Sequence, residues 1–404
     1  MQYLFDPISL SVIQHGQEMG FFKDSHFEQS MGVPLCAEDE QVKDFYERLT
    51  FVLSHSTKSQ LVILFINEKD NASIRQRESN QKVLQFFSFK ENESLKTFKI
   101  HKHLILVLNG TLDPWKLKAK EGVGRARRIL GDIGLYFFKE KMLLSSLHRQ
   151  SDADVRLPLD YFKAELIPGL IAGTYPFRHS RGVLSEDEYQ GLLEYESFLR
   201  SYVEGLQYAG SPYAFWALGS TLIFDLQAYE KIRGFPNVQA GEDFYFLSKM
   251  QSIGLVRQID TSSFNSSLDI QLEIVGRKSD RVPFGTGRAL ERLEKGNRYQ
   301  VYPLEAFQKL KMVLVELKKL SEHRDVQKFF LILPSEDHLN LIELKKSFEG
   351  IFKQKASSQH YLRQIHQTFE GLQTFRWVRE KTAAIYLDKS CLKSFENLCA
   401  NSSA

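Results

Sequence analysis

The sequence predicts an α/β protein with a mostly parallel sheet and flanking helices, followed by a helical C-terminal region. Two continuous apolar runs, Leu61 to Ile66 and His103 to Leu108, have the length and composition of buried central strands. A helical stretch that contains Val83, Leu84, Phe86 and Phe87 lies between them, and strand, helix, strand is the order of a parallel βαβ unit. From Tyr302 onward the apolar residues recur with a helical period.

Composition limits the classes of function. The 404 residues include 53 Lys and Arg against 50 Asp and Glu, a formal net charge of +3, so we expect no nucleic-acid partner. The three cysteines, Cys36, Cys391 and Cys399, are too scattered for a disulfide framework or a zinc site, which fits a reducing compartment. No apolar run reaches the length of a membrane span, and no secretory signal is evident. We therefore expect a cytoplasmic protein without a transmembrane segment.

Pattern changes along the chain predict three regions. Residues 1–60 are mixed, and we expect a lead-in that packs on the main domain. Residues 61–295 contain the predicted sheet and every candidate site below. Residues 296–404 form the helical C-terminal region, which carries no motif that indicates catalysis.

The helix that follows the second apolar strand begins at Gly122-Val123-Gly124, and its apolar face predicts packing on the sheet. Its free N–H groups, together with Arg125, Arg127 and Arg128, lie near the loop edge of the two strands. Open α/β sheets bind ligands at that edge, beyond the carboxyl ends of the strands. The alternative is that these arginines form only a solvated helix face.

Ser151-Asp152-Ala153-Asp154 reaches the same edge. If the turn follows a strand, the two carboxylates point the same way and form a hard oxygen site, which suits Mg²⁺ or Mn²⁺ holding a substrate diphosphate. Acidic turns are also common without any metal.

Further along, Ser185 to Glu188 has the spacing of a capping box, and the helix that follows ends at Gly210. A short strand, Thr221 to Phe224, precedes a short helix from Leu226. A last helix of this domain starts at Glu242-Asp243 and ends at Gly254.

Glu242 and Asp243 occupy the first turn of their helix, where free N–H groups and the helix dipole favour an ionised carboxylate. An ionised carboxylate can act as a general base. The alternative is that both acids only stabilise the helix start.

Two further features are candidates for ligand contacts. The segment from Arg277 to Arg288 is basic and broken by glycines, and its Arg281 and Arg288 could neutralise a diphosphate, although such a loop can also be a simple solvated turn. Trp216, in an aromatic cluster, could stack on an acceptor sugar, whereas most such clusters belong to a core.

The order of these motifs resembles the family 2 inverting glycosyltransferases, which have the GT-A fold. The resemblance covers residues 60–290 and rests on the landmarks Leu64-Phe65-Ile66-Asn67-Glu68, Gly122-Val123-Gly124-Arg125-Ala126-Arg127, Ser151-Asp152-Ala153-Asp154, Gly219-Ser220, Gly234-Phe235 and Gly241-Glu242-Asp243-Phe244. The closing Ser279-Asp280-Arg281-Val282-Pro283-Phe284-Gly285-Thr286-Gly287 is similar to a bacterial subgroup whose substrates are mostly unassigned.

The resemblance implies a role for each matching residue. Asp152 and Asp154 would hold the metal, with Asp152 also near the donor, and Asp243, beside Glu242, would be the general base. Asn67, Glu68, Asn109 and Arg127 would contact the donor nucleotide. The family usually has an Asp pair where this chain has Leu108-Asn109, so the chain departs from the family pattern at this position.

The implied reaction is transfer of a sugar, with inversion, from a UDP- or GDP-linked donor to a glycan or lipid-linked acceptor, as in polysaccharide biosynthesis. Such an enzyme would work in the cytoplasm or at the inner face of the membrane. Two alternatives remain open at this point. One is a nucleotidyltransferase, which would carry a glycine-rich basic signature after its first strand, and the other is a non-catalytic module with the same fold.

Overall fold

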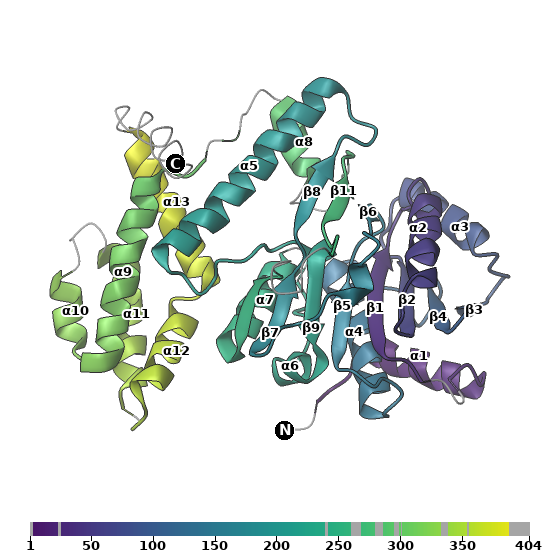
Figure 1. Cartoon of the computed structure of the whole chain (residues 1–404), viewed down its shortest axis with the longest axis horizontal. Helices are drawn as coiled ribbons and strands as arrows, with labels where there is room; N and C mark the ends of the chain where they lie inside the picture. The colour runs from purple at the N-terminus through teal and green to yellow at the C-terminus, as the bar shows by residue number, and fades with distance from the viewer. Residues whose placement is uncertain are drawn as a thin grey trace. The chain divides into compact units, whose positions relative to one another are not determined.

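The computed structural model of the chain divides into two compact units (Figure 1). The first comprises Met1–Leu192 and Ala217–Gly296, and the second comprises Leu193–Trp216 and Asn297–Ala404. The structure describes residues 3–22, 26–238, 241–259, 268–278, 286–294, 299, 301–332, 338–353 and 355–387. Helix α5 (Glu186–Ala209) begins in the first unit and continues in the second.

The first unit is built on an eight-stranded, mostly parallel sheet, in the order β10-β7-β9-β5-β1-β2-β4-β3. Strands β1, β2, β4 and β5 form its parallel centre. Strand β9 runs antiparallel to both of its neighbours, and β3 is an antiparallel edge strand. The strands are β1 (Gln29–Leu35), β2 (Gln60–Asn67), β3 (Leu95–Ile100), β4 (His103–Gly110), β5 (Leu147–Gln150), β7 (Leu170–Thr174), β9 (Leu222–Asp225) and β10 (Leu255–Gln258). The predicted α/β class is confirmed, as are both apolar strands, β2 and β4.

Helices cover both faces of this sheet. Because parallel crossovers are right-handed, α2 (Val42–Ser54) and α3 (Ile74–Phe86) lie on one face, and α4 (Val123–Lys139) lies on the other. Helix α4 packs against β1, β2 and β5, and α1 (Pro7–Glu18) packs against α4. The predicted helices that correspond to α3 and α4 are therefore confirmed.

The later helices of the first unit are α6 (Leu226–Lys231), α7 (Glu242–Ile253) and α8 (Thr286–Glu294), and two short 3-10 turns lie at Tyr161–Lys163 and Gly219–Thr221. Among these elements, α6 packs against β9, and α7 packs against β7 and β10. A second sheet has the order β6-β11-β8, from β6 (Val155–Arg156), β11 (Leu272–Val275) and β8 (Phe177–Ser180). The predicted start of α7 at Glu242 and its end at Gly254 are confirmed, and Ser185 and Glu188 make the reciprocal bonds of a capping box.

Strand β1 is a central strand that the sequence did not reveal. We expected residues 1–60 to be a lead-in that packs on the main domain, and the structure places their strand β1 between β2 and β5. Its apolar run is interrupted by Gly32 and Pro34, which are unusual in a central strand. Gly32 is explained by packing, because a Cβ there would lie 2.8 Å from Leu130 Cβ on α4.

Strand β5 is polar in sequence and wholly buried in the structure. The guanidinium of Arg149 donates to Tyr175 Oη at 2.7 Å, to Gln29 Oε1 at 3.0 Å and to Ala164 O at 2.6 Å. The His148 ring pairs with Ser30 Oγ at 2.8 Å. Internal partners therefore allow polar residues to occupy a central strand, and this strand leads directly into the acidic turn.

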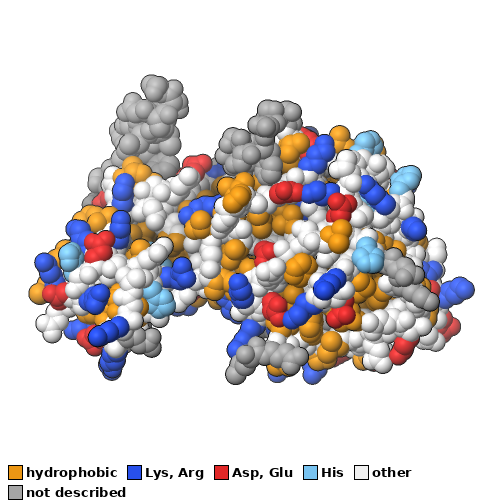
Figure 2. Space-filling model, turned by 60° about the horizontal axis from the view of Figure 1, so that its bottom comes forward, with side chains coloured by type: hydrophobic (Ala, Val, Ile, Leu, Met, Phe, Trp, Pro, Cys, Tyr) orange, Lys and Arg blue, Asp and Glu red, His pale blue; other side chains and the backbone are white. Residues whose placement is uncertain are grey.

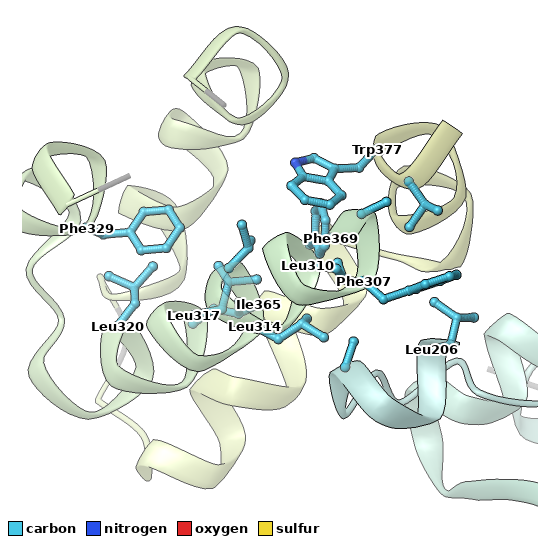
Figure 3. Packing of buried hydrophobic residues seen from close by; sticks show 14 of the residues in the cluster. Leu206, Phe307, Leu310, Leu314, Leu317, Leu320, Phe329, Ile365, Phe369 and Trp377 are labelled. Carbon is cyan, nitrogen blue, oxygen red and sulfur yellow. The ribbon is translucent and has the colours of Figure 1, made fainter. Parts of the chain in front are cut away.

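The second unit is helical, and Figure 1 shows α9 to α13 grouped in green to yellow. Its helices are the later part of α5, α9 (Leu304–His323), α10 (Val326–Ile332), α11 (His338–Ile351), α12 (Ser358–Thr368) and α13 (Gly371–Leu387). Figure 3 shows their core, in which Phe307, Leu310 and Trp377 are almost fully buried. The predicted helical C-terminal region is confirmed.

Helix length and hydropathy also bear on the expected absence of a membrane span. Among the residues described, no helix combines the length and apolar character needed to cross a bilayer. On the face drawn in Figure 2, blue and red charged side chains are interspersed.

Candidate active site

The candidate site lies where β5 and the N-terminal parts of α4 and α7 meet, and Arg127 is its central residue. Its Nη2 donates to Asp152 Oδ1 at 2.7 Å and its Nε donates to Glu242 Oε1 at 3.1 Å. The Arg127 side chain is only 3% exposed, and that of Glu242 only 6%. The structure thus brings together three residues that the sequence analysis placed in one site.

Backbone packing fixes the guanidinium of Arg127. A Cβ on Gly219 would lie 2.4 Å from Arg127 Nη2, so this turn approaches the arginine more closely than any larger residue allows. The carbonyl of Arg127 accepts from Gln150 Nε2 at 2.9 Å, which ties α4 to the end of β5. Arg127 Nη1 is buried and makes no hydrogen bond within the described part of the chain.

Asp243 follows Glu242 in α7 and is half-buried. Burial, together with the charge of Glu242, raises the pKa of its carboxyl to about 7, although the N–H groups of Phe244 and Gly219 and the charge of Arg127 oppose the shift. We expected the helix start to keep Asp243 ionised at neutral pH, whereas a pKa of about 7 leaves the carboxyl only partly ionised there. Desolvation and a neighbouring negative charge outweigh the helix N-terminus here.

The acidic turn directly after β5 presents two partly exposed carboxylates. The side chain of Asp152 is 31% exposed and that of Asp154 is 21% exposed. Each has a different arginine as a partner, Arg127 for Asp152 and Arg277 for Asp154. Val275 N donates to Asp154 O at 2.8 Å and so links the turn to β11 of the second sheet.

These carboxylates fit a divalent cation that is completed by a substrate. Asp152 and Asp154 supply hard oxygen donors that remain partly open to solvent. Within the described ranges, no group of three or more His, Cys, Asp and Glu side chains is arranged to hold a metal. Mg²⁺ and Mn²⁺ do not need such a cage, because one or two carboxylates and substrate phosphates commonly complete their coordination.

The strand-end residues predicted to contact the donor have internal partners. Asn67 Nδ2 donates to Leu35 O at 2.9 Å, which joins the ends of β2 and β1. Glu68 is buried and pairs with Lys116 at 3.2 Å. Asn109 Nδ2 donates to Glu93 O, just before β3, and Asn109 Oδ1 accepts from the N–H of Thr111 in the turn after β4.

Three candidates remain, namely Trp216, Arg281 and Arg288. Trp216 belongs to the second unit, where it is 5% exposed and has the guanidinium of Arg200 5.5 Å from its ring. Arg281 lies outside the described residues, and Arg288 is described only as a position within α8.

Two residues of the site were missed in the sequence. Glu38 follows β1 and is buried, and Arg277 follows β11 and bonds both Glu38 and Asp154. Glu38 could have been found only by recognising β1 as a strand, which Gly32 and Pro34 obscure. Arg277 stood in a segment identified as basic, but its sequence neighbours gave no sign of its partners.

Comparisons with known proteins give structural likeness only. No protein-family model and no curated protein matches the chain. The mannosyltransferase PcManGT from Pyrobaculum calidifontis, solved in complex with GDP-Man and Mn²⁺, has a TM-score of 0.39 at 10% identity, covering 98% of this chain and 90% of that one. Residues 1–349 of S. aureus TarS have a TM-score of 0.37 at 11% identity, covering 85% and 91%.

Proposed function

We propose that this chain is an inverting glycosyltransferase that moves a sugar from a nucleotide-diphosphate donor to an acceptor hydroxyl. The observation that carries the proposal is the group formed by Arg127, Asp152, Glu242 and Asp243. It joins a buried cation, a partly exposed acidic turn and a carboxyl with a pKa of about 7. The motif order described above supports the same reaction.

On the leaving-group side, negative charge grows on the diphosphate as its bond to the anomeric carbon breaks. Arg127 is held in place before any substrate arrives, so its positive charge can stabilise that change without reorganisation. Asp152 and Asp154 would hold Mg²⁺ or Mn²⁺, which when bound acts as a Lewis acid on the phosphate oxygens.

On the acceptor side, Asp243 is the proposed base. Its carboxylate takes the proton of the acceptor hydroxyl while the acceptor oxygen bonds to the anomeric carbon. The carbon–phosphate oxygen bond breaks, and the nucleoside diphosphate leaves with the electron pair. A pKa of about 7 suits this role, because the carboxyl is then both available as the ionised form and basic enough to accept a proton at neutral pH.

Glu242 is a positioning residue in this proposal. It touches Arg127 rather than the reacting atoms, and its charge contributes to the raised pKa of Asp243. Glu242 thus holds Arg127 on the leaving-group side and helps to raise the pKa of Asp243 on the acceptor side. We propose a UDP- or GDP-linked donor and a glycan or lipid-linked acceptor for this site.

The first test is calorimetric titration of UDP and GDP, with and without Mn²⁺, on the wild type, Asp154→Asn and Asp187→Asn. The last variant is a matched control, because Asp187 is exposed in the first turn of α5. We expect Mn²⁺-dependent binding of one nucleotide that is lost in Asp154→Asn and kept in Asp187→Asn. Absence of binding by folded wild type would overturn the proposal and favour a non-catalytic module.

A second assay addresses the chemistry. Donor hydrolysis or transfer should fall by about 10² to 10⁴ in Asp243→Asn, the usual effect of removing a general base, while nucleotide affinity stays within a few fold. Retention of full activity in a variant that still binds the nucleotide would exclude Asp243 as the base. Pyrophosphate release from a nucleoside triphosphate would instead indicate a nucleotidyltransferase.

A further inference from the structure

Arg277 makes a dense set of contacts beside the acidic turn. Its Nε and Nη2 donate to the same oxygen, Asp154 Oδ2, at 2.9 and 2.7 Å. Its Nη2 also lies 3.1 and 3.0 Å from the two oxygens of Glu38, and its Nη1 donates to Gln41 Oε1 at 3.3 Å. The side chain is 11% exposed, so this is a largely buried cluster rather than a surface ion pair.

The backbone around Arg277 is held on both sides. Val275 pairs through its N–H with Asp154 O, and Gly276 N donates to Ser180 O at 2.9 Å. A Cβ on Gly276 would lie 2.6 Å from Ser180 O, so this close approach requires glycine. Arg277 is therefore presented to Asp154 by the second sheet, while Glu38 is presented by the end of β1.

This geometry places a cation where the proposed metal would bind. Asp154 Oδ2 accepts two N–H groups of Arg277, which would compete with a divalent ion for the same oxygen. A divalent ion arriving alone would also stand next to a positive guanidinium. A nucleoside diphosphate changes this balance, because its phosphate oxygens can accept the hydrogen bonds that Arg277 gives up, in the bidentate manner that guanidinium favours.

We propose that Arg277 is a donor-binding residue that bonds Asp154 when no donor is bound and moves to the donor diphosphate when the donor and the cation bind. The inference rests on the proposed function, and it describes how the cation and the donor bind at that site. The cation and the nucleotide bind together, whereas the cation alone binds weakly. Glu38 keeps Arg277 beside the turn in both states.

The test measures the binding of Mn²⁺ alone and the binding of nucleotide in separate experiments. Mn²⁺ titration followed by electron paramagnetic resonance should show an affinity roughly tenfold higher in Arg277→Gln than in the wild type, equivalent to about 1.4 kcal/mol. Calorimetry should show an affinity for UDP or GDP, with Mn²⁺ present, roughly tenfold lower in the same variant. The two effects have opposite signs, which a merely structural role of Arg277 would not produce.

Controls separate this inference from the proposed function. Arg178→Gln removes an exposed arginine of β8 that pairs with Glu273, and it should change neither affinity. Arg277→Lys keeps the positive charge but loses the paired N–H donors of the guanidinium. Its affinities for Mn²⁺ and for the nucleotide should therefore lie between those of the wild type and Arg277→Gln. Equal or weaker Mn²⁺ binding by both folded variants would overturn the inference even if the wild type binds nucleotide. If the wild type binds no nucleotide, the proposed function fails together with the exchange onto phosphate.

Discussion

Arg127 Nη2 lies 2.7 Å from Asp152 Oδ1, and this pair connects the N-terminal part of α4 with the turn after β5. The same guanidinium reaches Glu242 on α7. A cation that is 3% exposed and shared by two carboxylates cannot be removed without leaving a buried charge.

We therefore expect Arg127→Ala to lower the free energy of unfolding by about 3 to 5 kcal/mol, because it leaves the buried Glu242 without this cation. Urea unfolding followed by circular dichroism measures the change. Arg181→Ala is the matched control, since Arg181 pairs with Glu186 at a site where the side chains are 55% and 61% exposed. Its effect should stay below about 0.5 kcal/mol, and an equal loss in both variants would contradict a special role for Arg127.

The raised pKa of Asp243 predicts a pH dependence of activity. Since the base must be ionised, the rate of transfer should rise with pH and level off above about 7. Replacing Glu242 by Gln removes one cause of the shift and should move the midpoint of this profile to lower pH. Initial rates from about pH 5 to 9 measure it, with Asp187→Asn as a control that keeps the wild-type midpoint.

The free energy of unfolding should fall as pH rises over the range in which activity increases. Between the ordinary pKa of 3.8 and the folded value of about 7, the folded protein holds a proton on Asp243 that the unfolded chain has released. The contribution of this group to the free energy of unfolding is therefore present below about pH 4 and lost as pH rises through 7. Asp243→Asn should flatten this part of the curve, and an unchanged slope would contradict the raised pKa.

Local sequence patterns identified the members of this residue cluster, whereas one central strand of the sheet was missed. Asp152, Glu242 and Arg127 were each identified from a local pattern, namely an acidic turn and two helix starts, and those patterns depend on residues that are neighbours in the chain. Strand β1 was missed because its run is interrupted by Gly32 and Pro34, and the glycine has its cause in tertiary packing. The partnership of Arg277 with Glu38 depends on the pairing of β1 and on the second sheet, so no local pattern could reveal it.

The pKa of Asp243 was mispredicted for a related reason. Its helix position is local and visible in the sequence, and that position alone favours ionisation. The burial that reverses the effect comes from the packing of α7 beside Gly219 and α4. Tertiary environment decided the sign of the shift.

A buried carboxylate outside the site gives a separate test of the fold. Asp132 on α4 is fully buried and accepts from Tyr3 Oη at 2.6 Å, Tyr229 Oη at 2.7 Å and Asp6 N at 2.6 Å. Asp132→Leu should cost about 2 to 5 kcal/mol in the free energy of unfolding, because these donors lose their acceptor. Tyr136→Phe, which removes a hydroxyl bonded to Gln17 at the surface, should cost less than about 0.5 kcal/mol in the same urea titration.

Replacing each of two helical glycines of the second unit by alanine should change the stability of that unit in opposite directions. A Cβ on Gly205 of α5 would lie 2.2 Å from the buried ring of Phe307, so Gly205→Ala must displace that ring and should destabilise the unit by about 1 to 3 kcal/mol. Gly350 of α11 is exposed, and a Cβ added there would have no neighbouring atom within 4 Å, so Gly350→Ala should stabilise by up to about 1 kcal/mol through helix propensity. Hydrogen exchange of the α9 amides measures both changes locally. Faster exchange in Gly205→Ala and equal or slower exchange in Gly350→Ala is the expected result, and slower exchange in Gly205→Ala would contradict the close packing of α5 on Phe307.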